Sequence, residues 1–183
     1  MNQNDDQLVE KKLSHKDIYK GKIIDVTVYD VELPNGETSS REVVYHQGAV
    51  GIIAVHDGYM YFVKQYRIAA EEVLLEIPAG KIEPKDTPEQ TAIKELKEET
   101  GLVAKEVQYL QEFYVSPGFS NEIIYLFEAD QLELEEQKLD EDEFLEIEKI
   151  KITDLEHLMK ENVFRDAKTL IAVQHVLYSN NYK

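Results

Sequence analysis

Hydrophobic and polar positions alternate along much of the first half of the chain, and this period of two predicts β-strands. Residues 23–33 are rich in β-branched side chains and are followed by a Pro-Asn-Gly turn, after which residues 42–45 resume the extended pattern. Residues 49–56 and 59–66 predict a second hairpin, and the first of these arms is apolar at nearly every position, as in a strand that is buried on both faces. A short strand is predicted at residues 73–77.

The period changes to about 3.6 residues after Thr87, which predicts a helix over residues 88–100. Thr87 and Gln90 have the spacing of a capping box, Pro88 occupies the first helical position, and Gly101 supplies a C-terminal stop. The remaining pattern predicts strands followed by helices, at residues 107–114, 123–129 and 144–152 and at residues 153–161 and 165–178. Strands and helices in this order predict an α/β (α+β) layered domain with a mixed sheet.

Composition narrows the class of protein. The chain has 183 residues, of which 43% are apolar, so it is long enough for one compact domain with a sizeable core. No apolar run is long enough to span a bilayer and the first residues are polar, so we expect a cytoplasmic protein with no membrane partner. The absence of cysteine excludes disulfides and thiolate catalysis.

The net charge of −17 argues against sequence-independent binding of nucleic acid, which needs clustered Lys and Arg. The acidic residues are concentrated in two segments. Residues 128–148 contain eleven carboxylates against Lys138 alone, and the second acidic segment is residues 76–100. A solvated face or loop is the ordinary interpretation of an acidic run.

The helix over residues 88–100 has an unusual arrangement of charge. Projected at 100° per residue, it places Glu95, Glu98 and Glu99 within one turn, on a different face from the apolar stripe that contains Leu96. Like charges at this spacing repel, and acid at a helix C-terminus opposes the helix dipole. A divalent cation would reverse the sign of this repulsion, because carboxylates are the oxygen ligands that Mg²⁺ or Mn²⁺ prefers. The alternative is an exposed acidic face that is partnered by lysines of the same helix.

A known family motif covers the same residues. Gly80, then Asp86 after five residues, then KELKEETGL at residues 94–102 after seven more, resembles the Nudix box, G-x5-E-x7-R-E-U-x-E-E-x-G-U, where U is aliphatic. Two positions depart from it: Asp86 stands where the family has Glu, and Lys94 where it has Arg. Asp keeps the charge with a shorter reach, whereas Lys lacks the planar fork that holds a carboxylate with two hydrogen bonds.

This resemblance implies an αβα-sandwich Nudix fold and hydrolysis of a nucleoside diphosphate that is linked to another group. It also implies a metal site made by Glu95, Glu98 and Glu99 with the backbone carbonyl of Ala79. The expected cation is Mg²⁺, with Mn²⁺ as the alternative.

Resemblance outside the box points to the ADP-ribose pyrophosphatase branch. Pro117 lies 15 residues after Leu102, the placement seen in that branch. The match implies that Arg41 and Glu42 hold the adenine end of the substrate and that Arg67 contacts its phosphates or ribose; Pro117 is counted among the substrate-binding positions. For these charged residues the alternative is a charge at the edge of a strand.

The same resemblance implies a role for the acidic segment at residues 128–148. In the branch, a glutamate in a loop before a late strand acts as general base toward the attacking water. Glu143 has this position here, with Glu141 as the second choice, and Glu98 is the third expected catalytic residue. A local excess of carboxylates would raise the pKa of such a base toward neutrality. A solvated loop is the alternative.

The resemblance also implies a homodimer. Residues 1–45 are expected to form a small antiparallel β region that dimerises, and residues 46–183 to form the Nudix hydrolase domain. The function we expect is Mg²⁺-dependent hydrolysis of a small-molecule nucleotide, ADP-ribose, to AMP and ribose 5-phosphate. The alternatives are another ADP-sugar or a dinucleotide as substrate, or a non-catalytic nucleotide-binding module, which the replacement at Lys94 keeps open.

Overall fold

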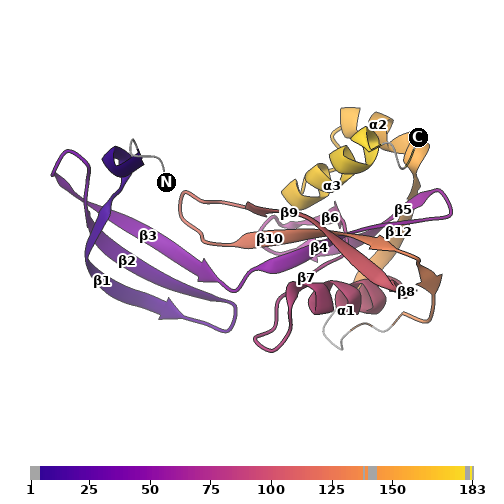
Figure 1. Ribbon diagram of the computed structural model, residues 1–183, viewed down its shortest axis with the longest axis horizontal. Coiled ribbons are helices and arrows are strands. Elements are labelled where there is room, and N and C mark those ends of the chain that lie inside the picture. The colour runs from indigo at the N-terminus through magenta and orange to yellow at the C-terminus, as the bar shows by residue number, and fades with distance from the viewer. Residues whose placement is uncertain (1–4, 138, 140–143, 180–181, 183) are drawn as a thin grey trace. The chain divides into compact units, whose positions relative to one another are not determined.

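The computed structural model describes residues 5–137, 139, 144–179 and 182. The chain divides into two compact units, Met1–Gly48 with Tyr114–Ile123, and Ala49–Phe113 with Ile124–Lys183. Figure 1 labels the elements along the chain. The strands are β1 (Lys11–Lys20), β2 (Ile24–Glu32), β3 (Thr38–His46), β4 (Ala49–His56), β5 (Tyr59–Arg67), β6 (Glu72–Glu76), β7 (Ala79–Lys81), β8 (Leu102–Val103), β9 (Glu106–Tyr114), β10 (Ile123–Asp130), β11 (Glu133–Leu134) and β12 (Leu145–Lys151). The helices are α1 (Pro88–Thr100), α2 (Ile152–Lys160) and α3 (Ala167–Tyr178), with a 3-10 turn at Asp5–Leu8.

The first unit is a three-stranded antiparallel sheet in the order β1-β2-β3. The predicted hairpin forms β2 and β3. Strand β1 was not predicted, because all ten of its residues are exposed and it therefore has no buried face to impose an alternating pattern. The segment Tyr114–Ile123 packs on β3, where the Val44 N–H donates to the Phe119 carbonyl at 2.7 Å.

The second unit is built on a mixed sheet in the order β12-β5-β4-β10-β9, with β6 paired to β5 and β7 paired to β4. Strands β4 and β10 run parallel, whereas β5 pairs antiparallel with β12, β4 and β6, and β7 pairs antiparallel with β4. The β4-β5 hairpin turns at Asp57 and Gly58, whose φ angles of 51° and 80° match the twist of the flanking strands. The mixed layered fold predicted from the sequence is confirmed.

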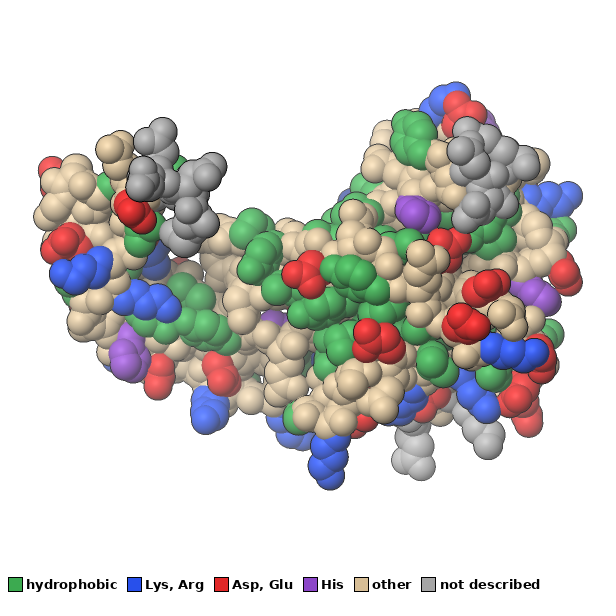
Figure 2. Space-filling view, viewed as in Figure 1, with side chains coloured by type: hydrophobic (Ala, Val, Ile, Leu, Met, Phe, Trp, Pro, Cys, Tyr) green, Lys and Arg blue, Asp and Glu red, His purple; other side chains and the backbone are tan. Residues whose placement is uncertain are grey.

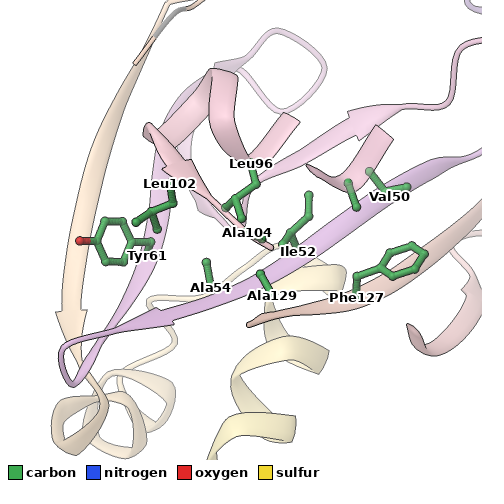
Figure 3. Close-up of a cluster of buried hydrophobic side chains, with 10 residues drawn as sticks. Val50, Ile52, Ala54, Tyr61, Leu96, Leu102, Ala104, Phe127 and Ala129 are labelled. Carbon is green, nitrogen blue, oxygen red and sulfur yellow. The ribbon is translucent and has the colours of Figure 1, made fainter. Parts of the chain in front are cut away.

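Alternation along β4 explains the layering of this unit. Val50, Ile52 and Ala54 pack in one core cluster with Leu96 of α1, as the close-up in Figure 3 shows. Ile53 points to the opposite face and packs in a second cluster with residues of α2 and α3. Helix α1 therefore covers one face of the sheet and α2 and α3 cover the other, as in Figure 1.

The surface of the second unit carries charges of both signs. Figure 2 shows acidic and basic side chains interspersed over the face that it presents. Ion pairs join the acidic segment to neighbouring lysines, as in Lys97 with Glu135 at 2.8 Å and Lys105 with Glu133 at 3.0 Å. No helix in the described part of the chain is both long and apolar enough to cross a membrane.

Candidate active site

Helix α1 is fixed at both ends by local hydrogen bonds. The Thr87 hydroxyl accepts from the Gln90 N–H at 3.3 Å, and the Gln90 side chain accepts from the Thr87 N–H at 2.9 Å, so the predicted capping box is present. At the other end Gly101 adopts a left-handed conformation, with φ of 72°, and its N–H donates to the Lys97 carbonyl. The helix therefore begins and ends where the sequence predicted, which sets the direction of its side chains.

The three box glutamates have different surroundings. Glu99 is only 3% exposed, and its Oε2 accepts a hydrogen bond from the Ala79 N–H at 3.0 Å. Its burial corrects the expectation of a glutamate face separate from the core stripe, because Glu99 lies beside the core where α1 meets β7. Glu95 and Glu98 are half-buried.

Gly80 marks a close approach between the backbone and Glu95. A Cβ atom at Gly80 would lie 2.0 Å from Cδ and 2.1 Å from Oε1 of Glu95. Real Cβ atoms essentially never come so close, so the glutamate carboxylate occupies space that only glycine leaves open. Glu95 and Glu99 thus both lie against the Ala79–Gly80 backbone.

The described residues contain no group of three or more His, Asp or Glu side chains already gathered closely enough to hold a metal ion. The donor chemistry nevertheless fits a hard divalent cation. Carboxylates of one helix lie against the backbone that carries the Ala79 carbonyl, and the glycine beside it leaves room for one of them. Oxygen donors of this kind are typical for Mg²⁺ and Mn²⁺.

Lys94 lies among the box carboxylates. Its Nζ is 3.5 Å from Glu83 Oε1. Burial of the ammonium lowers its pKa, but the charge of Glu98, and then that of Glu83, outweighs burial and raises the pKa above its usual 10.5. Lys94 therefore supplies positive charge beside the carboxylates, although it lacks the fork of an arginine.

Arg67, at the end of β5, makes a two-pronged ion pair with Glu76. Its Nε and Nη2 donate to the two carboxylate oxygens at 2.7 and 2.8 Å. Glu76 is 2% exposed, and Lys168 of α3 also contacts its Oε2. Burial alone would raise the pKa of Glu76, but hydrogen bonding to Arg67 and the charge of Lys168 outweigh it and lower the pKa to about 2.

A chain of hydrogen bonds also joins the start of α3 to Ile77, the residue after Glu76. The Asp166 carboxylate caps α3 by accepting from the Thr169 N–H at 3.0 Å, and it also accepts from the Thr169 hydroxyl at 2.7 Å. The Thr169 oxygen in turn accepts from the Ile77 N–H at 2.9 Å. Sequence reasoning assigned no role to Glu76, Lys168 or Thr169. The available signals were a carboxylate at the end of an apolar strand and a lysine in the first turn of a helix, where the dipole disfavours it.

The expected adenine-binding residues belong to the first unit. Arg41 and Glu42 are successive residues of β3, so their side chains point to opposite faces of the strand. Arg41 is half-exposed and its Nε donates to Glu10 at 2.9 Å. Pro117 lies in the segment that packs on β3. Arg67, Ala79 and the box glutamates belong to the second unit.

Glu141 and Glu143 lie outside the described residues. The chain that precedes them is held at the end of α1, where the Glu135 N–H donates to the Gly101 carbonyl at 2.7 Å and the Gln137 side chain donates to the Glu99 carbonyl. The chain that follows them enters β12 at Leu145.

Comparison with known proteins agrees with this geometry. The NUDIX domain matches residues 45–173, and the nucleoside diphosphate sugar hydrolase N-terminal domain matches residues 10–44. The chain belongs to the NUDIX family. Members of this hydrolase family generally use divalent metal ions.

Individual relatives include two from Bacillus species. The chain is 46% identical over 172 residues to the ADP-ribose pyrophosphatase of Bacillus subtilis (strain 168), covering 92% of this chain and 93% of that protein. It is 42% identical over 170 residues to the methanol dehydrogenase activator of Bacillus methanolicus, covering 91% and 92%. A crystal structure of an ADP compounds hydrolase superposes with a TM-score of 0.81 over 92% of each chain at 22% identity, which shows the same NUDIX fold. The resemblance to the family and its ADP-ribose pyrophosphatase branch is confirmed.

Proposed function

We propose that this NUDIX hydrolase cleaves the pyrophosphate bond of ADP-ribose in the presence of Mg²⁺, producing AMP and ribose 5-phosphate. The observation that supports this substrate is the 46% identity to an ADP-ribose pyrophosphatase over nearly the whole chain. The contacts of Glu99 with Ala79 and of Glu95 with Gly80 support the proposed site of reaction.

In the proposed site, Glu95, Glu98, Glu99 and the Ala79 carbonyl hold the cation. When bound, the cation offsets charge on the pyrophosphate oxygens and lowers the pKa of a nearby water. The hydrogen bond from Ala79 to Glu99 and the space that Gly80 leaves for Glu95 set the positions of two of these ligands before the cation binds. Such preorganisation reduces the rearrangement needed during reaction.

The remaining residues act on the substrate and the water. Arg67 uses one edge of its guanidinium for Glu76, and its Nη1 has no hydrogen bond to any described residue, so this nitrogen is the donor proposed for a phosphate or ribose oxygen. Arg41, Glu42 and Pro117 are proposed for the adenine end. Glu143, with Glu141 as the alternative, is proposed to accept the proton of the attacking water as the oxygen–phosphorus bond forms and the bridging oxygen leaves.

The deciding experiment incubates purified protein with ADP-ribose and Mg²⁺ and measures AMP and ribose 5-phosphate. The Glu98→Gln variant is the control for a contaminating activity. We expect a chelator to abolish AMP formation, because the surplus of negative charge repels an anionic substrate. No AMP with either Mg²⁺ or Mn²⁺ would refute the proposal. Comparing kcat/KM for ADP-ribose, other ADP-sugars and dinucleotides tests the alternative substrates. Binding without turnover would favour the nucleotide-binding module.

A second candidate function comes from the relative that is named a methanol dehydrogenase activator. If the chain shares that property, adding it to a methanol dehydrogenase will raise the rate of methanol oxidation. An unchanged rate at equimolar protein would remove this candidate.

We also propose a homodimer in the cytoplasm, with residues 1–45 as the dimerising region and residues 46–183 as the hydrolase domain. The described part of the first unit supports a dimer, because it exposes large apolar side chains that include Leu8, Leu13, Ile18 and Tyr19. Light scattering coupled to size exclusion tests the dimer by mass, and cell fractionation tests the location.

A further inference from the structure

The start of α3 contacts residues 76 and 77, in the segment that leads into the Nudix box. Each of the four residues 76–79 is held by a contact, two of them from α3 and one each from β4 and α1. Glu76 contacts Lys168, the Ile77 N–H donates to Thr169, the Pro78 carbonyl accepts from the Ile52 N–H at 2.8 Å, and the Ala79 N–H donates to Glu99. The segment that carries a proposed cation ligand is therefore held at every residue.

Lys168 stands at the centre of this arrangement. Its side chain is 11% exposed and contacts Glu76 and, at 3.0 Å, Asp166. A lysine in the first turn of a helix opposes the dipole, and burying its ammonium is unfavourable without partners. These two carboxylates offset both effects, so the cluster contains two cations, Arg67 and Lys168, and two anions.

The charge balance affects Arg67 directly. The Arg67 side chain is 42% exposed, and its guanidinium shares the Glu76 carboxylate with Lys168. Without the lysine charge, two carboxylates would face one cation. Arg67 would then be drawn more strongly to Glu76 and Asp166, and less positive potential would remain at the edge that faces an anionic ligand.

We propose that Lys168 is a positioning residue that acts through Glu76, setting the orientation and available charge of Arg67 toward a nucleoside diphosphate and steadying the segment that ends at Ala79. The inference rests on the proposed function, since it concerns the same site. The ammonium of Lys168 is held by Glu76 and Asp166, so the role assigned to it is indirect.

The test is a double-mutant cycle on Lys168 and Glu76, read by binding of the non-hydrolysable α,β-methylene analogue of ADP-ribose with Mg²⁺ in isothermal titration. Lys168→Met should weaken binding about tenfold, within the range of coupling between contacting residues. In the Glu76→Gln background the same change should alter Kd less than about twofold, because the charge through which Lys168 acts is gone. Lys168→Arg should restore binding to within about threefold, and Lys160→Met, which removes an exposed lysine paired with Glu156, should bind as wild type.

Kinetics provide the second readout. Lys168→Met should raise KM more than it lowers kcat, whereas a general loss of folded protein would lower kcat alone. If Lys168→Met does not fold, the comparison of Glu76→Gln with the double variant and the rescue by Lys168→Arg decide the question.

Equal weakening by Lys168→Met in both backgrounds, or wild-type binding by Lys168→Met, would overturn the inference. Wild-type protein that binds the analogue but does not hydrolyse ADP-ribose would refute the proposed function, and the binding cycle would still decide the role of Lys168. Protein that does neither would refute both.

Discussion

The contact between Gly80 and Glu95 predicts that Gly80→Ala inactivates the enzyme without unfolding it. The added methyl would lie 2.0 Å from Glu95 Cδ, and ordinary van der Waals contact begins at 3.4 Å. The carboxylate must therefore retreat by about 1.4 Å. The three nearest atoms all belong to one glutamate side chain, so it can move while the backbone stays in place.

The size of the effect follows from this displacement. Misplacing a catalytic group by about 1 Å costs about 100-fold in rate, so kcat should fall about 100-fold, equivalent to roughly 2.7 kcal/mol of lost transition-state stabilisation. The stability change should stay below about 1 kcal/mol, or about 4 °C in Tm for a chain of this size. Steady-state hydrolysis of ADP-ribose and a thermal melt measure the two quantities on the same preparation.

Glu95→Ala supplies the matched background. Removing the carboxylate opens the space beside Gly80, so Gly80→Ala should change the residual rate less than about twofold in that background. Wild-type kcat in Gly80→Ala would show that the position of Glu95 is unimportant. A fall in Tm well beyond 4 °C would show that the methyl disturbs the fold instead of the carboxylate.

Three further predictions concern single charges. Glu143→Gln should lower kcat by about two orders of magnitude, as expected for a general base; an unchanged rate would exclude this residue. Lys94→Arg should raise kcat/KM by up to about tenfold, because a guanidinium can hold a carboxylate with two hydrogen bonds, and identical kinetics would show that lysine already suffices. Glu76 has a pKa of about 2 in the folded chain against an ordinary 4.5. Its ionisation therefore contributes up to roughly 3 kcal/mol to the free energy of unfolding above pH 4.5, and this contribution is lost as the pH falls toward 2. In the Glu76→Gln variant the free energy of unfolding, measured with urea, should therefore fall less steeply as the pH is lowered from 5 to 3. A slope equal to that of the wild type would contradict the assigned pKa.

The sequence predicted those elements whose signals are local. The bounds of α1 match because Thr87, Gln90, Pro88 and Gly101 each act within one turn of the helix ends. Strand β4 also matches, because burial on both faces leaves an unbroken apolar run. The helix predicted at residues 165–178 begins later, at Ala167, because the Asp166 side chain provides the cap.

Other features could not be predicted because they depend on distant contacts. The two-residue strands β8 and β11 pair with each other in a separate two-stranded sheet and are too short to show a period. Strand β7 has only three residues and lies just beyond the strand predicted at residues 73–77, yet it pairs with β4. The Glu76 cluster joins residues that are 92 positions apart, so no local pattern reveals it. By contrast, Glu95, Glu98 and Glu99 were selected from helical spacing, although the burial of Glu99 beside Ala79 required the fold.

The parallel pairing of β4 with β10 has a consequence for how the protein folds. Ile124 pairs with Ala49, and the chain between them contains β7 and α1, including Ala79, Gly80 and the box glutamates. Closing a loop of this length costs roughly 4 kcal/mol in chain entropy, and contacts so distant in sequence form slowly. The proposed cation ligands therefore come together on a sheet that is completed late in folding. Substitutions that weaken the pairing of β4 with β10, away from the proposed site, should accordingly reduce the yield of active enzyme and the refolding rate, while molecules that do fold keep their normal turnover.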